Sequence, residues 1–140
     1  MTIVYAWRWP LVLLGLLLLA ACGGSGGSAD VSVGESLFNG ETLIADGNAP
    51  TCISCHPIQP EEAGTIGTNL SNIGNRAATT VPDQSAEDYL RTSTVDGDAY
   101  LAGGYQEGIH YRGYGEALSE DQINALVAYM LTLKSGWDEQ

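Results

Sequence analysis

The sequence has little positive charge and no apolar segment long enough to favour a membrane-spanning helix. Its 140 residues contain 5 Lys and Arg against 17 Asp and Glu, which gives a formal net charge of −12. A surface of this sign excludes nucleic-acid binding, because that function needs basic side chains. The apolar run Leu11–Ala21 covers 11 residues, whereas a membrane-spanning helix needs about 20. The length suits one modest domain.

The apolar run ends in small residues directly before a cysteine. Residues 1–21 carry one charge, Arg8, and close on Leu19-Ala20-Ala21-Cys22. This pattern resembles the lipobox of bacterial lipoproteins, in which the Cys becomes the lipidated N-terminus after cleavage. We therefore predict a lipoprotein signal peptide over residues 1–21 and lipidation of Cys22. An ordinary signal peptide and a short membrane span are the alternatives.

The predicted lipoprotein divides into three further parts. Residues 22–31 form the lipidated Cys and a flexible Gly/Ser tether, residues 32–136 a folded domain and residues 137–140 a short tail. This organisation places the domain at the extracytoplasmic (periplasmic) face of the cell membrane. Removal of residues 1–21 takes away the single base Arg8 and changes the net charge from −12 to −13. Such a charge favours encounter with a basic partner, although it also serves simply to keep a protein in solution.

Helix-start signals occur at three places in the domain. Ser32–Glu35 is a capping box, which predicts a helix that runs toward Ile44 and ends at Gly47. Ser85 predicts the start of a second helix. Ser119–Gln122 is another capping box, and the helix behind it is expected to end at Gly136.

The last of these helices has a clear apolar face. Its apolar positions follow the spacing i, i+3, i+4, i+7 of a packed helix: Ile123, Leu126, Val127 and Met130. No alternating strand pattern is convincing, so we predict an all-α fold with three or more helices. The connecting segments are long and rich in Gly, Thr, Asn and Asp. Loops of that length in a small domain need something to enclose, and a large buried cofactor would supply it.

The pentapeptide Cys52-Ile53-Ser54-Cys55-His56 matches the c-type haem attachment motif C-x-x-C-H. Two thiols on one helical turn can bond the two vinyl groups of one porphyrin, and the imidazole that follows reaches the iron as its proximal ligand. The export signal agrees, since covalent haem attachment in bacteria is completed outside the cytoplasm. We predict one covalent haem c, held by Cys52, Cys55 and His56.

Three other interpretations of the cysteine pair are weaker. A thioredoxin-like redox pair would need a βαβ context, which the sequence lacks. A zinc site would need a second ligand pair such as another C-x-x-C or an H-x(3–5)-H. A disulfide between Cys52 and Cys55 would close a strained ring and leave the loops with nothing to enclose.

The order of these motifs resembles class I monohaem cytochromes c over about Val33–Lys134. The likeness includes Gly34 and Phe38, CISCH, GTNL at 67–70 and the stretch from residue 85 to 134. It is nearest to the cytochrome domains associated with membrane oxidases and quinol-oxidising complexes. The resemblance implies a small class I cytochrome c fold wrapped around one haem. It also implies that Gly34 and Phe38 lie where the first helix crosses the last, with Phe38 near Tyr129.

The resemblance also indicates the remaining haem contacts. The family usually has a Met eight residues before the Leu that precedes the last helix, and counting back from Leu118 gives His110. We therefore predict bis-histidine ligation by His56 and His110, the alternative being a solvated loop histidine. Thr68 stands where the family usually has a Pro whose carbonyl accepts the proximal His N–H, and a carbonyl is retained in Thr68. Met130 is expected in the core.

These residues predict one-electron transfer by a lipid-anchored c-type cytochrome in a respiratory or photosynthetic chain. The expected partners are redox proteins of a membrane electron-transport complex, and the chain is expected to be a carrier, or a subunit of an oxidoreductase complex, with no catalytic residues. A haem enzyme or gas sensor with an open sixth position is the alternative. A subunit whose haem only stabilises the fold is a third possibility.

Overall fold

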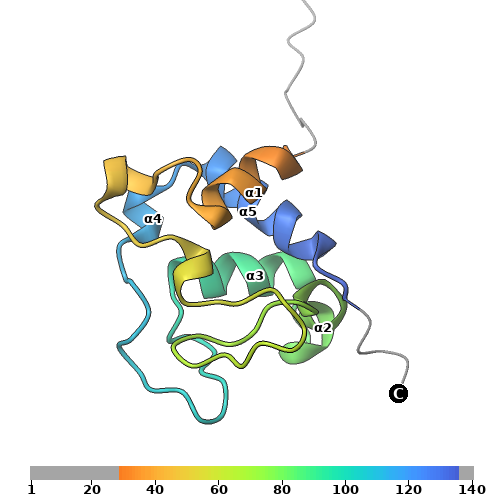
Figure 1. Cartoon of the computed structure of the whole chain (residues 1–140). Coiled ribbons are helices and arrows are strands. Elements are labelled where there is room, and N and C mark those ends of the chain that lie inside the picture. The colour runs from red at the N-terminus through yellow and green to blue at the C-terminus, as the bar shows by residue number, and fades with distance from the viewer. Residues whose placement is uncertain (1–28, 136–140) are drawn as a thin grey trace, which may run out of the picture.

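The computed structural model describes residues 29–135 as a set of packed helices joined by long loops (Figure 1). The elements in chain order are α1 (Val31–Asn39), the 3-10 turns η1 (Ile44–Gly47) and η2 (Cys52–Ser54), α2 (Ile73–Thr80), α3 (Ala86–Val95), α4 (Tyr114–Ala117) and α5 (Glu120–Thr132). Within residues 29–135 there is no strand, so the predicted all-α class with three or more helices is confirmed.

The predicted membrane-attachment segments fall outside this range. The signal peptide over residues 1–21, Cys22, most of the tether at 22–31 and the tail at 137–140 are not among the described residues. Among the helices of residues 29–135, none has the length and apolar character needed to cross a membrane.

The first helix begins one residue before its predicted capping box. Asp30 is the N-cap, and its Oδ1 accepts hydrogen bonds from the Ser32 backbone N–H at 2.9 Å and the Ser32 hydroxyl at 2.8 Å. Asp is as good an N-cap as Ser, because its side chain reaches the same free backbone N–H groups.

The first helix also ends earlier than predicted. Gly40 adopts a left-handed conformation with φ 79°, and its N–H bonds to the Leu37 carbonyl. Glycine takes this conformation without the cost that a Cβ imposes, which is why it ends helices so often. The prediction of a helix running to Gly47 is therefore wrong. Ala45 and Asp46 have positive φ in the separate turn η1.

The predicted starts of the other two helices are confirmed. The Ser85 hydroxyl accepts from the Asp88 N–H at 3.1 Å at the start of α3. At α5, the Ser119 hydroxyl accepts from the Gln122 N–H at 3.2 Å, and the Gln122 side chain accepts from the Ser119 N–H at 2.9 Å. Both halves of the capping box are thus present.

The last helix stops short of its predicted end. α5 ends at Thr132 instead of at Gly136, because Leu133 leaves the helix and its carbonyl accepts a hydrogen bond from the Gly74 N–H of α2 at 2.9 Å. α2 was not predicted from the sequence, because it has few apolar residues and no side-chain cap. It packs against both α3 and α5. The four-residue α4 was missed as well.

The predicted crossing of the first and last helices is confirmed. α1 and α5 pack against each other so closely that a Cβ on Gly34 would collide with the carbonyl of Ala125 and come within 2.9 Å of Tyr129 Cβ. The rings of Phe38 and Tyr129 lie 5.3 Å apart at 58°, a favourable tilted geometry. The opening between α1 and α5 therefore has no room for any residue larger than Gly at position 34.

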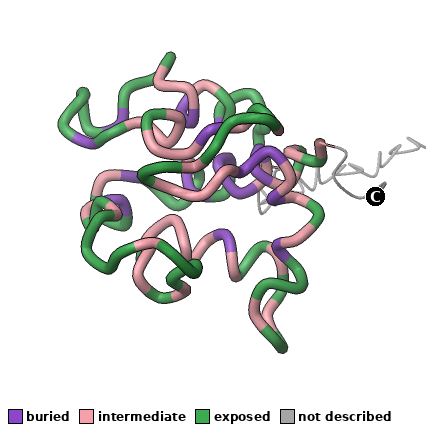
Figure 2. The backbone as a smooth tube through the Cα atoms, turned by 60° about the horizontal axis from the view of Figure 1, so that its bottom comes forward, coloured by how far each residue is buried: buried purple, intermediate pink, exposed green. Residues whose placement is uncertain are grey.

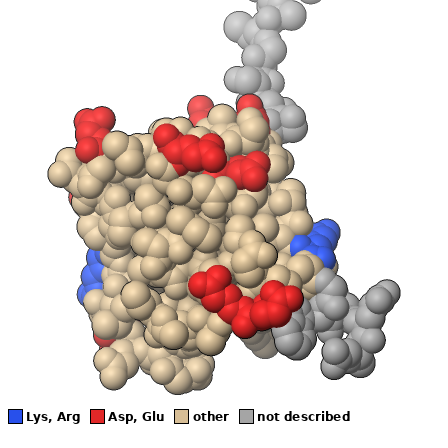
Figure 3. Space-filling model, viewed as in Figure 1, with Lys and Arg blue, Asp and Glu red and all other residues tan. Residues whose placement is uncertain are grey.

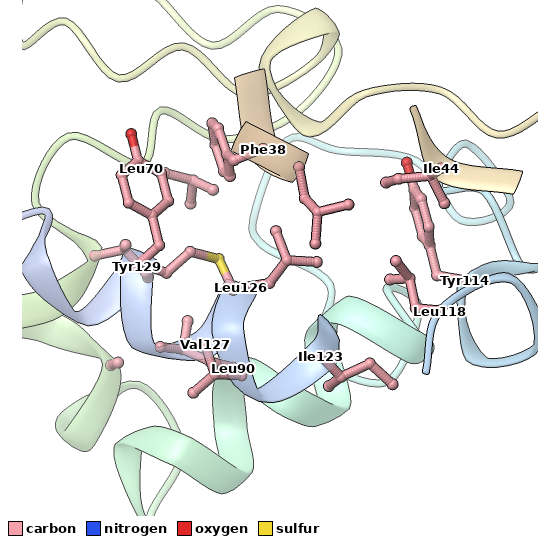
Figure 4. Packing of buried hydrophobic residues seen from close by; sticks show 14 of the residues in the cluster. Phe38, Ile44, Leu70, Leu90, Tyr114, Leu118, Ile123, Leu126, Val127 and Tyr129 are labelled. Carbon is pink, nitrogen blue, oxygen red and sulfur yellow. The ribbon is translucent and has the colours of Figure 1, made fainter. Parts of the chain in front are cut away.

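One hydrophobic core fills the space between the helices. Its side chains come chiefly from α5, with others from α1, α2 and α3, and Figure 4 shows Phe38, Leu90 and Leu126 among them. Met130 is 7% exposed within the same cluster, which confirms its predicted place in the core. In Figure 2 the buried backbone gathers where the helices meet, while the loops are mostly exposed or half-buried. A few residues outside the five α-helices, among them Ile44, Leu70 and Leu118, nevertheless belong to the core.

Candidate functional site

The CISCH segment forms a tight turn. Cys52–Ser54 is the 3-10 turn η2, and the N–H groups of Cys55 and His56 both bond to the Cys52 carbonyl, at 3.1 Å and 2.9 Å. Both cysteines are free and half-buried. The turn therefore presents two unpaired thiols and one imidazole from five consecutive residues.

His56 is held by the loop that follows it, residues 57–70, which we call the His56 loop. The Nδ1 of the His56 imidazole donates a hydrogen bond to the Thr68 carbonyl of this loop at 2.9 Å. Burial lowers the pKa of His56, and the bond to Thr68 opposes this shift. The imidazole is therefore neutral at pH 7 with Nδ1 committed, which leaves Nε2 available as a metal ligand.

A glycine makes room for this imidazole. A Cβ at Gly67 would lie 2.5 Å from His56 Cε1 and 2.8 Å from Nε2. The backbone of the His56 loop is fixed on both sides of this contact, since the Gly67 N–H bonds to the Cys55 carbonyl at 3.0 Å and the Leu70 N–H to the Pro57 carbonyl at 2.8 Å. Gly67 belongs to the GTNL segment of the family resemblance, but its contact with His56 was not predicted.

His110 reaches the same region from a second loop, residues 96–113, which we call the His110 loop. Its ring lies 5.3 Å from that of Tyr114 and packs so tightly on Gly97 that a Cβ there would come within 2.6 Å of Nδ1. Burial is the main cause that lowers the pKa of His110, and the nearby His56 acts in the same direction. Unlike His56, His110 has its Nδ1 buried with no hydrogen-bond partner among residues 29–135.

All the predicted site residues of the described chain line one cavity. Cys52, Cys55, His56, Thr68 and His110 surround about 1220 Å³ of space that protein atoms do not fill, the open mouth included. The rest of the lining is largely apolar and includes Phe38, Leu70, Ile73, Leu90 and Met130. Cys22, the predicted lipidation site, lies outside the described residues.

Two tyrosines connect the segments that enclose the cavity. The Tyr105 hydroxyl, on the His110 loop, donates to the Gly64 carbonyl of the His56 loop at 2.9 Å. The Tyr114 hydroxyl donates to the Pro50 carbonyl at 2.8 Å. Sequence reasoning missed both, because a tyrosine in a glycine-rich loop carries no signal of its partner 41 or 64 positions away.

The structure also bears on the other interpretations of the cysteine pair. The βαβ context that a thioredoxin-like redox pair would need is absent from residues 29–135. Burial raises the pKa of the Cys52 thiol to about 11, whereas redox-active cysteines have lowered pKa values. No cluster of three or more His, Cys, Asp and Glu side chains in this range is placed to hold a metal ion. Neither thiol is in a disulfide.

Comparison with known proteins gives one positive result. The family model described as cytochrome c matches residues 37–134, which is more than half of the chain. No curated protein matches the sequence. The matched region contains both loops, both imidazoles and the α5 helix.

Proposed function

The chain belongs to the cytochrome c family, and from that premise we propose that it is a lipid-anchored one-electron carrier whose iron is ligated by His56 and His110. The predicted small class I cytochrome c fold and its single covalent haem c are confirmed by family membership and the all-helical architecture. The chain is accordingly an electron-transfer haem protein rather than an enzyme.

The residues that line the cavity fit this cofactor. Cys52 and Cys55 would bond the porphyrin, since both thiols are free and come from the same turn. The bound haem supplies an iron that alternates between the ferric and ferrous states. His56 offers Nε2 to it, with Nδ1 held by the Thr68 carbonyl, which orients the ring and raises its basicity.

His110 supports an occupied sixth position. It lines the same cavity as His56, and burial in this cavity, followed by the effect of His56, lowers the pKa of its imidazole. Its Nδ1 is buried without a hydrogen-bond partner in the described range. A solvated loop histidine would have neither property. The same facts argue against a haem enzyme or gas sensor, which would need that position open.

Besides the axial ligands, the apolar lining of the cavity is the second way in which the protein would control the iron. It excludes water from the iron, and together with the axial ligands this sets the reduction potential. Imidazole in place of the thioether usual in the family would give a lower potential, because Met ligation raises it.

Surface charge supports a basic redox partner. Among residues 29–135, Arg91 pairs with Glu120 and Arg112 with Asp98, so two of the few bases are already neutralised by acids. Figure 3 shows acidic atoms spread over the viewed face and basic atoms only at its sides. Long-range attraction would then speed encounter with a cationic surface.

We place the anchored protein at the extracytoplasmic face, as a carrier or as a subunit of a membrane oxidoreductase complex, on the sequence evidence from Leu19–Cys22.

Redox titration and electron-exchange kinetics test this function. The holoprotein should titrate as a single one-electron centre. It should react faster with the cationic hexaammineruthenium complex than with ferricyanide, and added salt should reduce the difference. Turnover of hydrogen peroxide or slow exchange with both probes would count against an electron carrier.

A further inference from the structure

The two sides of His110 are tied to one carboxylate. Asp98 Oδ1 accepts a hydrogen bond from the Gly108 backbone N–H at 3.0 Å, and Oδ2 accepts one from Arg112 Nη2 at 2.6 Å. These two partners stand two residues before and two residues after His110. The Asp98 side chain is only 14% exposed, although that of Arg112 is 69% exposed. The Gly108 N–H, and then Arg112, hold the pKa of Asp98 below its usual range, so the carboxylate is ionised.

Within the described part of the chain, the imidazole between these two contacts lacks the Nδ1 hydrogen bond that orients the ring of His56. His56 is oriented by the Thr68 carbonyl, but the Nδ1 of His110 has no acceptor within residues 29–135. The residues on either side of it are not helical, and Gly108 has φ 81°. The position of the ring therefore depends on how the loop is held, and Asp98 holds it at the Gly108 backbone and at the Arg112 side chain.

We propose that Asp98 is a positioning residue that keeps His110 on the iron by holding its loop through the Gly108 backbone N–H on one side and the Arg112 guanidinium on the other. The inference rests on the proposed ligation by His110. Without the carboxylate, Gly108 loses its hydrogen bond and Arg112 is released to solvent. The loop then opens more often, and each opening takes the imidazole away from the sixth position.

A purely structural ion pair would act differently. Its loss would lower stability without exposing the iron to an external ligand. Glu107 provides the comparison within the same loop. Its carboxylate is 3.9 Å from the Arg112 guanidinium and 77% exposed, and within the described part of the chain it accepts no backbone hydrogen bond. Glu107→Gln removes the same charge as Asp98→Asn but leaves both contacts of Asp98 intact.

Binding of carbon monoxide to the reduced holoprotein tests the proposal. Because CO can bind only after His110 leaves, its rate reports loop opening. In Asp98→Ala we expect CO to bind at least about tenfold faster than in the wild type, the factor that corresponds to losing one hydrogen bond to a charged group. Asp98→Asn should also be faster, since its amide can accept from Gly108 but no longer pairs with Arg112. Glu107→Gln should match the wild type.

Variants of Arg112, which pairs with Asp98, keep the test decisive if Asp98→Ala fails to fold. Arg112→Gln should accelerate CO binding, and Arg112→Lys should restore slow binding because an ammonium group still pairs with the carboxylate. If the wild type itself binds CO as readily as His110→Ala, ligation by His110 is wrong. If the wild type resists CO and both Asp98→Asn and Arg112→Gln resist it equally, ligation stands and the role of Asp98 is refuted.

Discussion

Replacing Gly67 by Ala should displace the proximal histidine. The added Cβ would lie 2.5 Å from His56 Cε1 and 2.7 Å from Nδ1. Carbon atoms in contact are about 3.5 Å apart or more, so the ring must move by about 1 Å. The loop cannot yield easily, because the Gly67 N–H is bonded to the Cys55 carbonyl. The bond from Nδ1 to the Thr68 carbonyl, 2.9 Å long, would then exceed the hydrogen-bonding range.

The cost follows from these two effects. Overpacking a filled site costs about 1–3 kcal/mol, and a lost hydrogen bond adds about 1 kcal/mol. We therefore expect the free energy of unfolding of the holoprotein to fall by about 2–4 kcal/mol. The midpoint potential should rise, since an imidazole without its acceptor is a less basic ligand and stabilises ferric iron less.

Denaturant unfolding and redox titration of the two oxidation states measure both quantities. Gly103→Ala is the matched control, because a Cβ at Gly103 meets no atom within 4 Å. It should change neither stability nor potential appreciably. If Gly67→Ala behaves like Gly103→Ala, the reasoning about the imidazole and its loop is refuted.

Three further substitutions test other parts of the account. Cys52→Ser combined with Cys55→Ser should abolish the haem stain on denaturing gels, and haem that extracts from the wild type into acidified organic solvent would contradict covalent attachment. Cys22→Ala should leave the chain unprocessed or release it from the membrane, whereas mass spectrometry of the wild type should find an acylated Cys22 as the first residue. Gly34→Ala should lower the free energy of unfolding by about 1–3 kcal/mol, because its Cβ would collide with Ala125; unchanged denaturant unfolding would mean that the α1–α5 contact adapts.

Local signals in the sequence were enough to locate most of the helical framework. The hydroxyl caps at Ser85 and Ser119 predicted α3 and α5 because a cap bonds to N–H groups two or three residues away. The close approach at Gly34 followed from the family resemblance and is present. The end of α1 was misjudged because Gly40 already adopts the left-handed conformation that ends the helix, seven residues before Gly47.

Features that depend on tertiary contacts could not be predicted from the sequence. α2 has no side-chain cap and is placed by a backbone bond to Leu133. The contacts of Asp98 and Tyr105 join residues 10 to 41 positions apart across loops without periodicity. The site residues differ in how they could be predicted. Cys52, Cys55 and His56 form one short motif, whereas His110 could be assigned only from the spacing usual in the family.

The spectrum of the ferric holoprotein tests ligation by His56 and His110 most directly. We predict low-spin iron without the weak far-red absorption band of a thioether–iron bond, and a potential below that of the His110→Met variant, which should gain the band. The far-red band in the wild type, or high-spin ferric iron with an open sixth position, would contradict ligation by His110.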